Sequence, residues 1–494
     1  MADSSELILT ASRWAVLSVA AQAIKAVLLF GSQVVLARLL SPIDFGIVAM
    51  CAPIFSFLSI FNDLGLSQAT IQRPSLTRSE SNLIFWMNAG LGLGVALTIM
   101  AIAPAAAHFY SDGRVTALLI AMSFVILINS LSSQQVALLV RGIRPVPLLI
   151  IDILPVIGNV IVSIAAAMLG YSYWSIVIGQ ATHAFTAGSI AWIASDFRPS
   201  WPRDLRQAIP ILRVGGHLTG LNIGSFVAGN LSPVLIGRLY GVVQVGLYDR
   251  AFKLVSMSYM QILAPISRIA ETLLARLIDD DTKYRKAFFQ IAEATLLVAL
   301  PGLLSIAIMS DAAVSLLYGA KWIDCSPIVS YIAFGSLMSP LGTVATWLFI
   351  TQGRTAEMLR YGLISNLLTV ASLLAGIAWG AVGVAISFTV FAVPTHGLTV
   401  WAATRNGPVT LANFLAMLSP IAVALAVAGA AVLSLSIVMN DDRLSSVVKF
   451  SCGIAASYLT VILSLGCSVA GRRVLVDAAR IREVFIRRRG LSTS

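Results

Sequence analysis

Residues 35–46 read VLARLLSPIDFG, and residues 234–246 read VLIGRLYGVVQVG. In the first stretch Arg38-Leu39 precedes Gly46; in the second, 200 residues further on, Arg238-Leu239 precedes Gly246 at the same spacing. In both places one long apolar run ends and the next begins. The two stretches therefore predict the same kind of turn at two positions in the chain. The apolar runs on either side of each turn indicate the fold.

The chain has the composition of a protein that is surrounded by lipid. Of its 494 residues, 58% are hydrophobic and 11% are charged, with a mean hydropathy of +0.89. About a quarter of the residues in an ordinary globular domain are charged. The sequence therefore predicts an integral membrane protein.

No motif in the sequence indicates a metal, a cofactor or a catalytic centre. The four cysteines, Cys51, Cys325, Cys452 and Cys467, are scattered without a CxxC spacing, so they indicate neither a metal site nor a disulfide framework. A nucleotide-binding loop of the form GxxxxGK[ST] does not occur either. We therefore expect no metal ligands, no cofactor and no ATP-driven transport by this chain alone.

Fourteen apolar runs are long enough to cross a bilayer as helices, which need about 20 residues each. The expected fold class is all-α, a polytopic membrane protein with about fourteen transmembrane helices. Twelve or thirteen spans stay open, because only Gly380 separates two of the runs. The runs are 14–37, 44–67, 82–109, 115–139, 148–170, 172–194, 214–240, 247–275, 287–309, 325–350, 357–378, 381–403, 411–438 and 446–470.

Basic residues alternate between the connectors of these runs. Most of the 33 lysines and arginines fall on every second connector and on the C-terminal tail. Cytoplasmic loops are enriched in Lys and Arg, so both termini are expected to be cytoplasmic. The net charge of +11 then faces the anionic lipids of that leaflet, and no nucleic acid partner is expected. The opposite side carries Arg38, Arg114, Arg238, Lys321, Arg443 and Lys449.

The two quoted turns are six predicted spans apart. Because six is even, the helices that flank the two turns cross the membrane in the same direction. This predicts a parallel repeat, an architecture in which transporters bind substrate between the two halves. The alternative is chance, since two interfacial turns can each need an arginine and a glycine. The predicted domains are an N-terminal six-helix lobe (1–197), a second six-helix lobe (198–408), two additional transmembrane helices (409–470) and a basic cytoplasmic amphipathic tail (471–494).

A set of short motifs, dense over residues 14–90, resembles those of a known family. The motifs are Trp14, Gln22, LARLLSP (36–42), DFG (44–46), VAM (48–50), DLGL (63–66), Gln72-Arg73, Phe85-Trp86 and Asn88, followed by GLY (246–248), Arg250-Ala251, LYG (317–319) and Trp322. They are similar to the motifs of polysaccharide flippases, the Wzx-like branch of the multidrug/oligosaccharidyl-lipid/polysaccharide exporter superfamily. Within that branch they most resemble the succinoglycan-type (ExoT-like) exopolysaccharide transport proteins.

The resemblance implies a flippase of the bacterial inner membrane, not an enzyme. A member of this family would move polyprenyl-pyrophosphate-linked oligosaccharide repeat units to the periplasmic leaflet by alternating access, for exopolysaccharide synthesis. Its partners would be that lipid-linked oligosaccharide and membrane lipids, with a polysaccharide polymerase and chain-length or export proteins as optional additions. Such a cargo needs a polar, cationic cavity that opens sideways, because the polyprenyl tail stays in the lipid.

Charged side chains inside the predicted spans are the candidates for lining that cavity. A charge at the centre of a bilayer costs about 2.5–3.5 kcal/mol on insertion scales, so it is a functional candidate by default. The acidic candidates are Glu271 and Glu293. The basic candidates for substrate binding are Lys25, Arg250, Lys253 and Arg268.

Each basic candidate also has a structural interpretation. Lys25 lies too deep in its span to snorkel, so cavity lining is favoured over structural pairing. Arg250 and Lys253 lie near enough to the outer boundary to reach lipid headgroups, and neither interpretation is preferred for them. Arg268 and Glu271 are three residues apart on one predicted helix, which favours an ion pair between them.

Two other classes of function stay open. A cation-coupled drug or metabolite exporter of the same superfamily would favour acidic residues in its cavity, whereas the deepest charge in this sequence is Lys25. A membrane polysaccharide polymerase or ligase would need a sizeable periplasmic loop with catalytic groups. The longest outer connector, near residues 310–324, is too small for such a domain.

Overall fold

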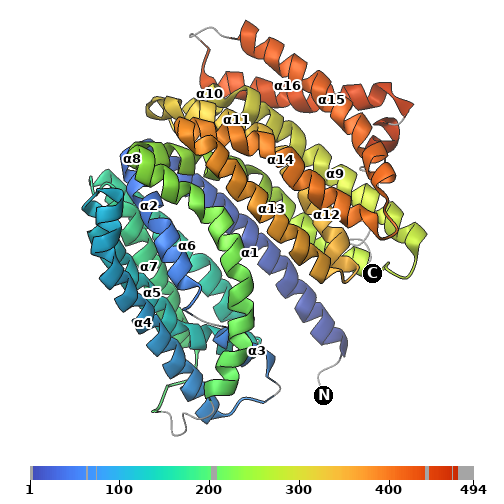
Figure 1. The fold of residues 1–494 in the computed structure, drawn as a ribbon. Coiled ribbons are helices and arrows are strands. Elements are labelled where there is room, and N and C mark those ends of the chain that lie inside the picture. The colour runs from blue at the N-terminus through green and yellow to red at the C-terminus, as the bar shows by residue number, and fades with distance from the viewer. Residues whose placement is uncertain are drawn as a thin grey trace. The chain divides into compact units, whose positions relative to one another are not determined.

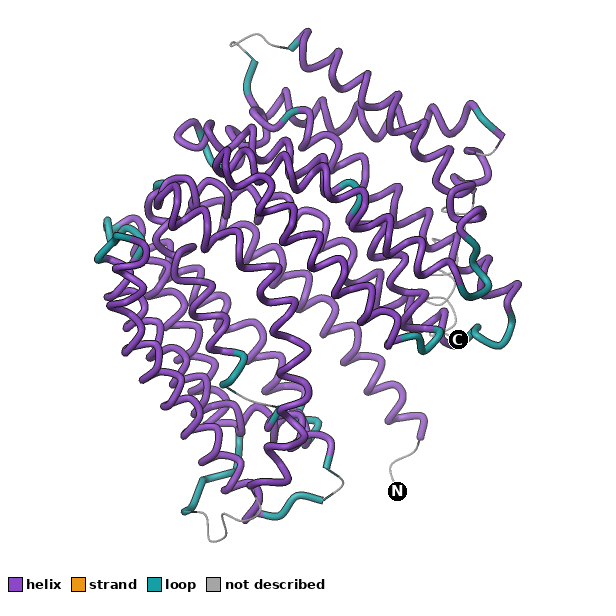
Figure 2. The backbone as a smooth tube through the Cα atoms, in the orientation of Figure 1, coloured by secondary structure: helices purple, strands orange, loops and turns teal. Residues whose placement is uncertain are grey.

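The computed structural model describes residues 4–62, 65–73, 75–201, 208–439, 444–469 and 471–476. Figures 1 and 2 show long helices joined by short loops, and the described residues include no strand. The expected all-α polytopic fold is confirmed. Most of the predicted basic tail, from residue 477 onward, lies outside the described residues, as do Asp63 and Leu64 of the DLGL motif.

Contacts divide the chain into two compact units, Met1–Gly246 and Leu247–Ser494. The division falls inside α8 (Ala208–Ala275), which consists of two helices because Gly241 has φ 81° and ψ −177°. Only glycine adopts such a backbone conformation readily. The first half of α8 packs with the N-terminal unit, where Gly237 lies against Met50 and Tyr110. Contacts therefore place residues 208–246 with the preceding helices.

Among the described residues, the N-terminal unit contains seven complete helices and the part of α8 up to Gly246. These helices are α1 (Ser4–Leu39), α2 (Pro42–Ser59), α3 (Leu66–Gln72), α4 (Arg78–Tyr110), α5 (Arg114–Arg141), α6 (Pro145–Met168) and α7 (Trp174–Ala194).

The C-terminal unit begins at Leu247, within the second half of α8. It continues with α9 (Asp281–Ile308), α10 (Ser310–Leu317), the 3-10 helix η2 (Ala320–Cys325), α11 (Ser326–Ser336), α12 (Ser339–Thr351), α13 (Thr355–Gly376), η3 (Ile377–Trp379), α14 (Gly380–Arg405), α15 (Leu411–Val438) and α16 (Ser446–Cys467).

Twelve stretches of the described residues are long and apolar enough to cross a membrane. Three of these stretches contain more than one helix. Ala320–Thr351 consists of the short segments η2, α11 and α12, which together have the length of one span. Gly229–Ala275 includes the break at Gly241, and Thr355–Arg405 includes a second break at Gly380, where φ is 72°. With Gly229–Ala275 and Thr355–Arg405 each divided into two spans and the other stretches counted once, the described residues give the fourteen spans that the apolar runs predict.

The first quoted stretch contains the signal that starts α2. Ser41 is the N-cap: its Oγ accepts a hydrogen bond from the Asp44 backbone N–H at 3.3 Å, and the Asp44 carboxylate accepts one from the Ser41 N–H at 2.8 Å. Pro42 occupies the first helical turn, where no intrahelical donor is needed. The sequence Ser-Pro-Ile-Asp therefore stops α1 at Leu39 and restarts the chain as α2.

The two quoted stretches touch each other inside the N-terminal unit. A Cβ atom on Gly46 would overlap the backbone carbonyl of Val242, and a Cβ atom on Gly246 would overlap the carbonyl of Pro42. The contact is reciprocal, because Val242 stands 200 residues after Pro42 and Gly246 stands 200 residues after Gly46. Reciprocal pairs of this kind are what a two-fold axis produces. Both glycines are needed because two backbones meet without room for a side chain.

The same pattern of helix pairs occurs within each of the two units. In the N-terminal unit α4 packs on α5, α5 on α7 and α6 on α7. In the C-terminal unit α9 packs on α11, α11 on α14 and α13 on α14. Each pair of the second set lies six spans after its equivalent in the first set. This recurrence supports the parallel repeat that the two turns predict.

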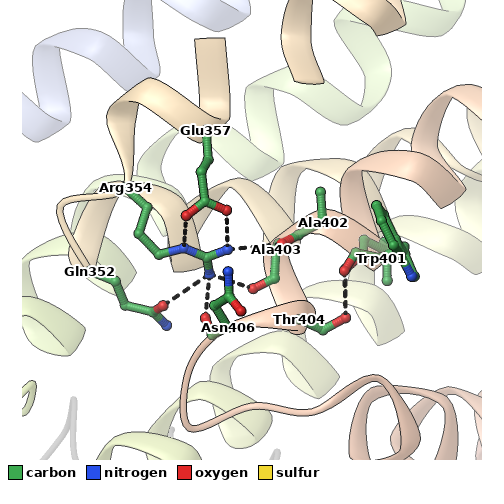
Figure 3. Close-up of polar contacts among 9 residues, drawn as sticks. Gln352, Arg354, Glu357, Trp401, Ala402, Ala403, Thr404 and Asn406 are labelled. Carbon is green, nitrogen blue, oxygen red and sulfur yellow. Dashed lines mark hydrogen bonds and ion pairs between the residues drawn. The ribbon is translucent and has the colours of Figure 1, made fainter. Parts of the chain in front are cut away.

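Arg354 joins the loop after α12 to the end of α14, as Figure 3 shows. Its guanidinium donates to both carboxylate oxygens of Glu357 at 3.1 and 2.7 Å. It also donates to the backbone carbonyls of Ala402, Ala403 and Asn406 at 2.9, 2.8 and 2.5 Å. A helix leaves its last carbonyls without intrahelical partners, and a cation is favourable at that end. The Arg354 side chain is 12% exposed and satisfies several of these groups at once.

Candidate functional site

Lys25 on α1 lies beside an acidic residue of α6. Its Nζ is 3.9 Å from Oδ1 of Asp152, and the two side chains are 31% and 45% exposed. A partly exposed ion pair at this distance is weak. The ammonium group therefore has an acidic neighbour and still has room for another partner.

Sequence reasoning missed Asp152. In the segment LLIIDILP this carboxylate is a single charge among apolar residues, as Lys25 is in its own span. The rule that singles out charges in spans would have found it. Helices α1 and α6 thus each contribute one ionisable residue to the same part of the N-terminal unit.

Arg250 and Lys253 share one carboxylate on α8. The Arg250 guanidinium donates to Oδ2 of Asp249 at 3.1 and 2.7 Å, and Lys253 Nζ lies 2.9 Å from Oδ1. The Arg250 side chain is 3% exposed, whereas the Lys253 side chain is 44% exposed. Arg250 is therefore buried, and Lys253 is the more accessible cation. Asp249 was not among the predicted residues, although it lies between two motif residues in the segment LYDRA.

Arg268 is exposed on α8. Among the described residues it forms no ion pair with Glu271, so the expected pairing of these two side chains is wrong. Lys25 belongs to the first unit, and Arg250, Lys253 and Arg268 belong to the second. Their convergence on one cationic cavity stays a prediction.

A cavity of about 470 Å³ lies within the C-terminal unit. Its walls are single faces of α8, α11, α12, α13 and α14. On α13 the lining positions 358, 361, 362, 365, 366, 369 and 372 follow helical spacing, and so do 388, 391, 392, 395, 396 and 399 on α14. Ten of the lining residues are Ser or Thr, and none of the described residues in the lining is Asp, Glu, Lys or Arg.

The sequence analysis missed this cavity because it took only charged residues within the predicted spans as candidates for the site. The signal was present as hydroxyl residues three or four apart in consecutive spans, for example Ser365 and Thr369 on α13 and Thr395 and Thr399 on α14. A polar stripe in an otherwise apolar membrane helix has to face something other than lipid.

His396 on α14 occupies a recess that Gly342 leaves open on α12. A Cβ atom on Gly342 would overlap Nδ1 of the imidazole. The other ring nitrogen, Nε2, is 3.4 Å from the Ser339 hydroxyl. Elsewhere in the described residues, no group of three or more His, Cys, Asp and Glu side chains could hold a metal ion.

Comparison with known proteins identifies a family. A family model described as polysaccharide biosynthesis protein matches residues 35–327. The lipopolysaccharide biosynthesis protein WzxC of Escherichia coli K12 is 22% identical over 364 residues, 72% of this chain and 73% of its own. The succinoglycan biosynthesis transport protein ExoT of Rhizobium meliloti is 22% identical over 349 residues, 70% of each chain.

One solved structure shares the fold over nearly the whole length. The lipid II flippase MurJ, in an inward closed conformation, superposes with a TM-score of 0.72 and covers 91% of this chain and 97% of its own. The two sequences are 12% identical. At that identity the likeness is one of fold.

Proposed function

The chain belongs to the polysaccharide biosynthesis protein family, and we propose that it is a flippase for polyprenyl-pyrophosphate-linked oligosaccharide repeat units in a bacterial inner membrane. The family match over 35–327, more than half of the 494 residues, carries the proposal. WzxC and ExoT, named for lipopolysaccharide synthesis and succinoglycan transport, support a saccharide cargo. The fold shared with MurJ supports movement of the cargo by alternating access.

In this proposal the cations of the chain hold the pyrophosphate during its passage. Lys25 is the first contact, because its ion pair with Asp152 is long enough for an anion to compete with the carboxylate. Asp152 would pair with Lys25 again once the anion has left. Lys253 and Arg268, both accessible, extend the positive potential, and Arg250 supports Lys253 through Asp249.

The test is transport of the lipid-linked repeat unit by purified protein in vesicles. Lys25→Ala is expected to lower the initial rate about ten- to a hundredfold, since a hydrogen bond between charged groups contributes about 1.5–3 kcal/mol. Lys25→Arg should keep part of the activity, because charge matters more than shape at such a contact. Lys283→Ala is the control: Lys283 is a highly exposed lysine paired with Asp280, and its loss should leave the rate unchanged.

A double variant separates ligand binding from structural pairing. If Lys25 only neutralises Asp152, then Lys25→Ala combined with Asp152→Asn should recover activity, because no charge is left unpaired. If Lys25 contacts the pyrophosphate, the double variant should stay as slow as Lys25→Ala. Recovery in the double variant would overturn the role of Lys25, and absence of transport by the wild-type protein would overturn the function.

One observation favours a second function, a cation-coupled exporter of drugs or metabolites. Asp152 is a half-exposed carboxylate inside a membrane span, the type of residue that a cationic substrate or a coupling ion requires. In that case Asp152→Asn should abolish export of a cationic dye while Lys25→Ala should increase it. A flippase should show the opposite order of importance, with a larger loss of transport in Lys25→Ala than in Asp152→Asn.

A further inference from the structure

Several hydroxyl groups around the cavity of the C-terminal unit donate their proton to a backbone carbonyl of the helix wall. Thr343 donates to the backbone carbonyl of Ser339 at 3.1 Å, and Thr346 donates to that of Gly342 at 2.9 Å. Thr369 donates to the Ser365 carbonyl at 3.0 Å. A hydroxyl has one proton and two lone pairs, so each of these oxygens can still accept hydrogen bonds. The wall is therefore rich in acceptors.

The same pattern continues on the two facing helices. Thr399 donates to the carbonyl of Thr395 at 3.2 Å, and Ser365 of α13 donates across to the same carbonyl at 3.4 Å. Asn366 also lies on the lining face of α13, and its amide has no hydrogen-bond partner among the described residues. An unpartnered amide inside a membrane span is costly unless a ligand or water satisfies it.

The absence of charged residues from the described lining limits the class of ligand. A pyrophosphate or an ammonium ion would lose its hydration on entry and find no opposite charge, which is far more costly than burying a hydroxyl. The best fit is a neutral molecule that carries many O–H donors. The cavity volume lies in the range of pockets that hold small ligands.

Aromatic rings complete the lining. Phe252 and Tyr259 come from α8, Tyr361 from α13, and Phe388 and Phe391 from α14. Aromatic side chains bury large apolar area and lose little conformational freedom in doing so. A pyranose ring has this dual character: its rim of hydroxyls donates hydrogen bonds, and its C–H faces are apolar enough to lie on an aromatic ring.

We propose that this cavity is a subsite for the uncharged sugar residues of the translocated unit. The inference rests on the proposed flippase function and assigns the cargo's sugars to the C-terminal unit, where hydroxyl acceptors, the Asn366 amide and aromatic faces recognise them. The pyrophosphate is excluded from the subsite and depends on the cations described above. Specificity for the cargo is then set by neutral side chains of α12, α13 and α14.

The test compares two lipids in the same vesicle assay: the full lipid-linked repeat unit, and polyprenyl pyrophosphate carrying one hexose. Asn366→Leu and Thr369→Val keep side-chain volume and remove hydrogen-bonding groups from the cavity. Each variant should slow the full repeat unit about tenfold, because sugar hydroxyls are left unpaired, and should leave the one-hexose lipid unaffected. Thr404→Val is the matched control: Thr404 also donates to a backbone carbonyl of α14, at 2.8 Å, but does not line the cavity.

The ratio of the two rates separates the subsite from a structural effect. A variant that slows both lipids equally, or neither, would overturn the subsite while the proposed function stands. Wild-type protein that moves neither lipid would overturn the function and the subsite with it. A changed ratio in Asn366→Leu and Thr369→Val, with wild-type unfolding temperatures and an unchanged ratio in Thr404→Val, is the expected result.

Discussion

A single guanidinium, that of Arg354, holds the α12–α13 loop against the end of α14. Arg354→Ala should lower the free energy of unfolding by about 2 kcal/mol, because several carbonyls and the Glu357 carboxylate lose a charged donor together. Arg354→Lys should recover little of this loss, since an ammonium cannot donate to these diverging acceptors at once. Thermal unfolding of the detergent-solubilised protein measures both changes.

Arg360 provides the control for this prediction. Arg360 is exposed on α13, and its described contact is with the ring of Tyr361, 6.0 Å from the ring centroid, so Arg360→Ala should leave stability nearly unchanged. Full stability in Arg354→Lys would show that charge alone, without the planar group, holds the helix end.

At the residue level, the sequence identified charges better than it identified their partners. Lys25 could be singled out because a lysine in the middle of an apolar run is anomalous by itself. Its neighbour Asp152 is about 130 residues away in the chain, and their proximity depends on how α1 packs on α6. The reverse error occurred at Arg268 and Glu271, where helical spacing suggested an ion pair that is absent from the described part of the chain.

Where α2 contacts the start of the second half of α8, the two backbones are too close to accept a side chain at Gly46 or Gly246. Gly46→Ala should destabilise the protein by about 1–3 kcal/mol, because the added methyl group would overlap the Val242 carbonyl and neither backbone can move freely. Gly246→Ala should have a similar effect through Pro42, as the reciprocal geometry requires. Yield of folded protein and unfolding temperature are the measurements.

Gly90→Ala serves as the matched substitution in an uncrowded helix. Nothing lies within 4 Å of a Cβ atom at Gly90 in α4, so alanine there should be neutral or stabilise by up to about 1 kcal/mol. If Gly46→Ala behaved like Gly90→Ala, the close approach of the two quoted turns would be refuted.

The positions of the helices in the sequence could be predicted better than which side of each helix lines the cavity. Apolar runs give span positions directly, because the thickness of the bilayer sets their length. The breaks at Gly241 and Gly380 were also accessible, since glycine marks a backbone that leaves the helical region. The lining of the hydroxyl cavity was not, because Ser and Thr occur in membrane helices for several reasons and only packing shows which of them share a space.

For the whole molecule, an internal repeat explains why the Arg-Leu…Gly spacing of residues 35–46 occurs again in residues 234–246. The reciprocal glycine contact and the recurrence of helix pairs six spans apart are two independent observations, one local and one spread over both units. We expect spans 1–6 and 7–12 to superpose as six-helix bundles when the units are compared, with the turns at 38–46 and 238–246 coinciding. A superposition that fails beyond the two turns would reduce the repeated spacing to a local similarity.

The orientation of the molecule in the membrane gives the last prediction. An even number of spans places both termini on one side, and the basic connectors around Arg141, Lys283 and Arg354 assign that side to the cytoplasm. Alkaline phosphatase, active only outside the cytoplasm, should therefore be inactive when fused after Lys283 or Ser494 and active when fused after Asp112. Activity after Ser494 would show an odd number of spans or an inverted chain. Activity after both Lys283 and Ser494, with none after Asp112, would identify inversion and would place the basic connectors on the outer face, against the cation distribution.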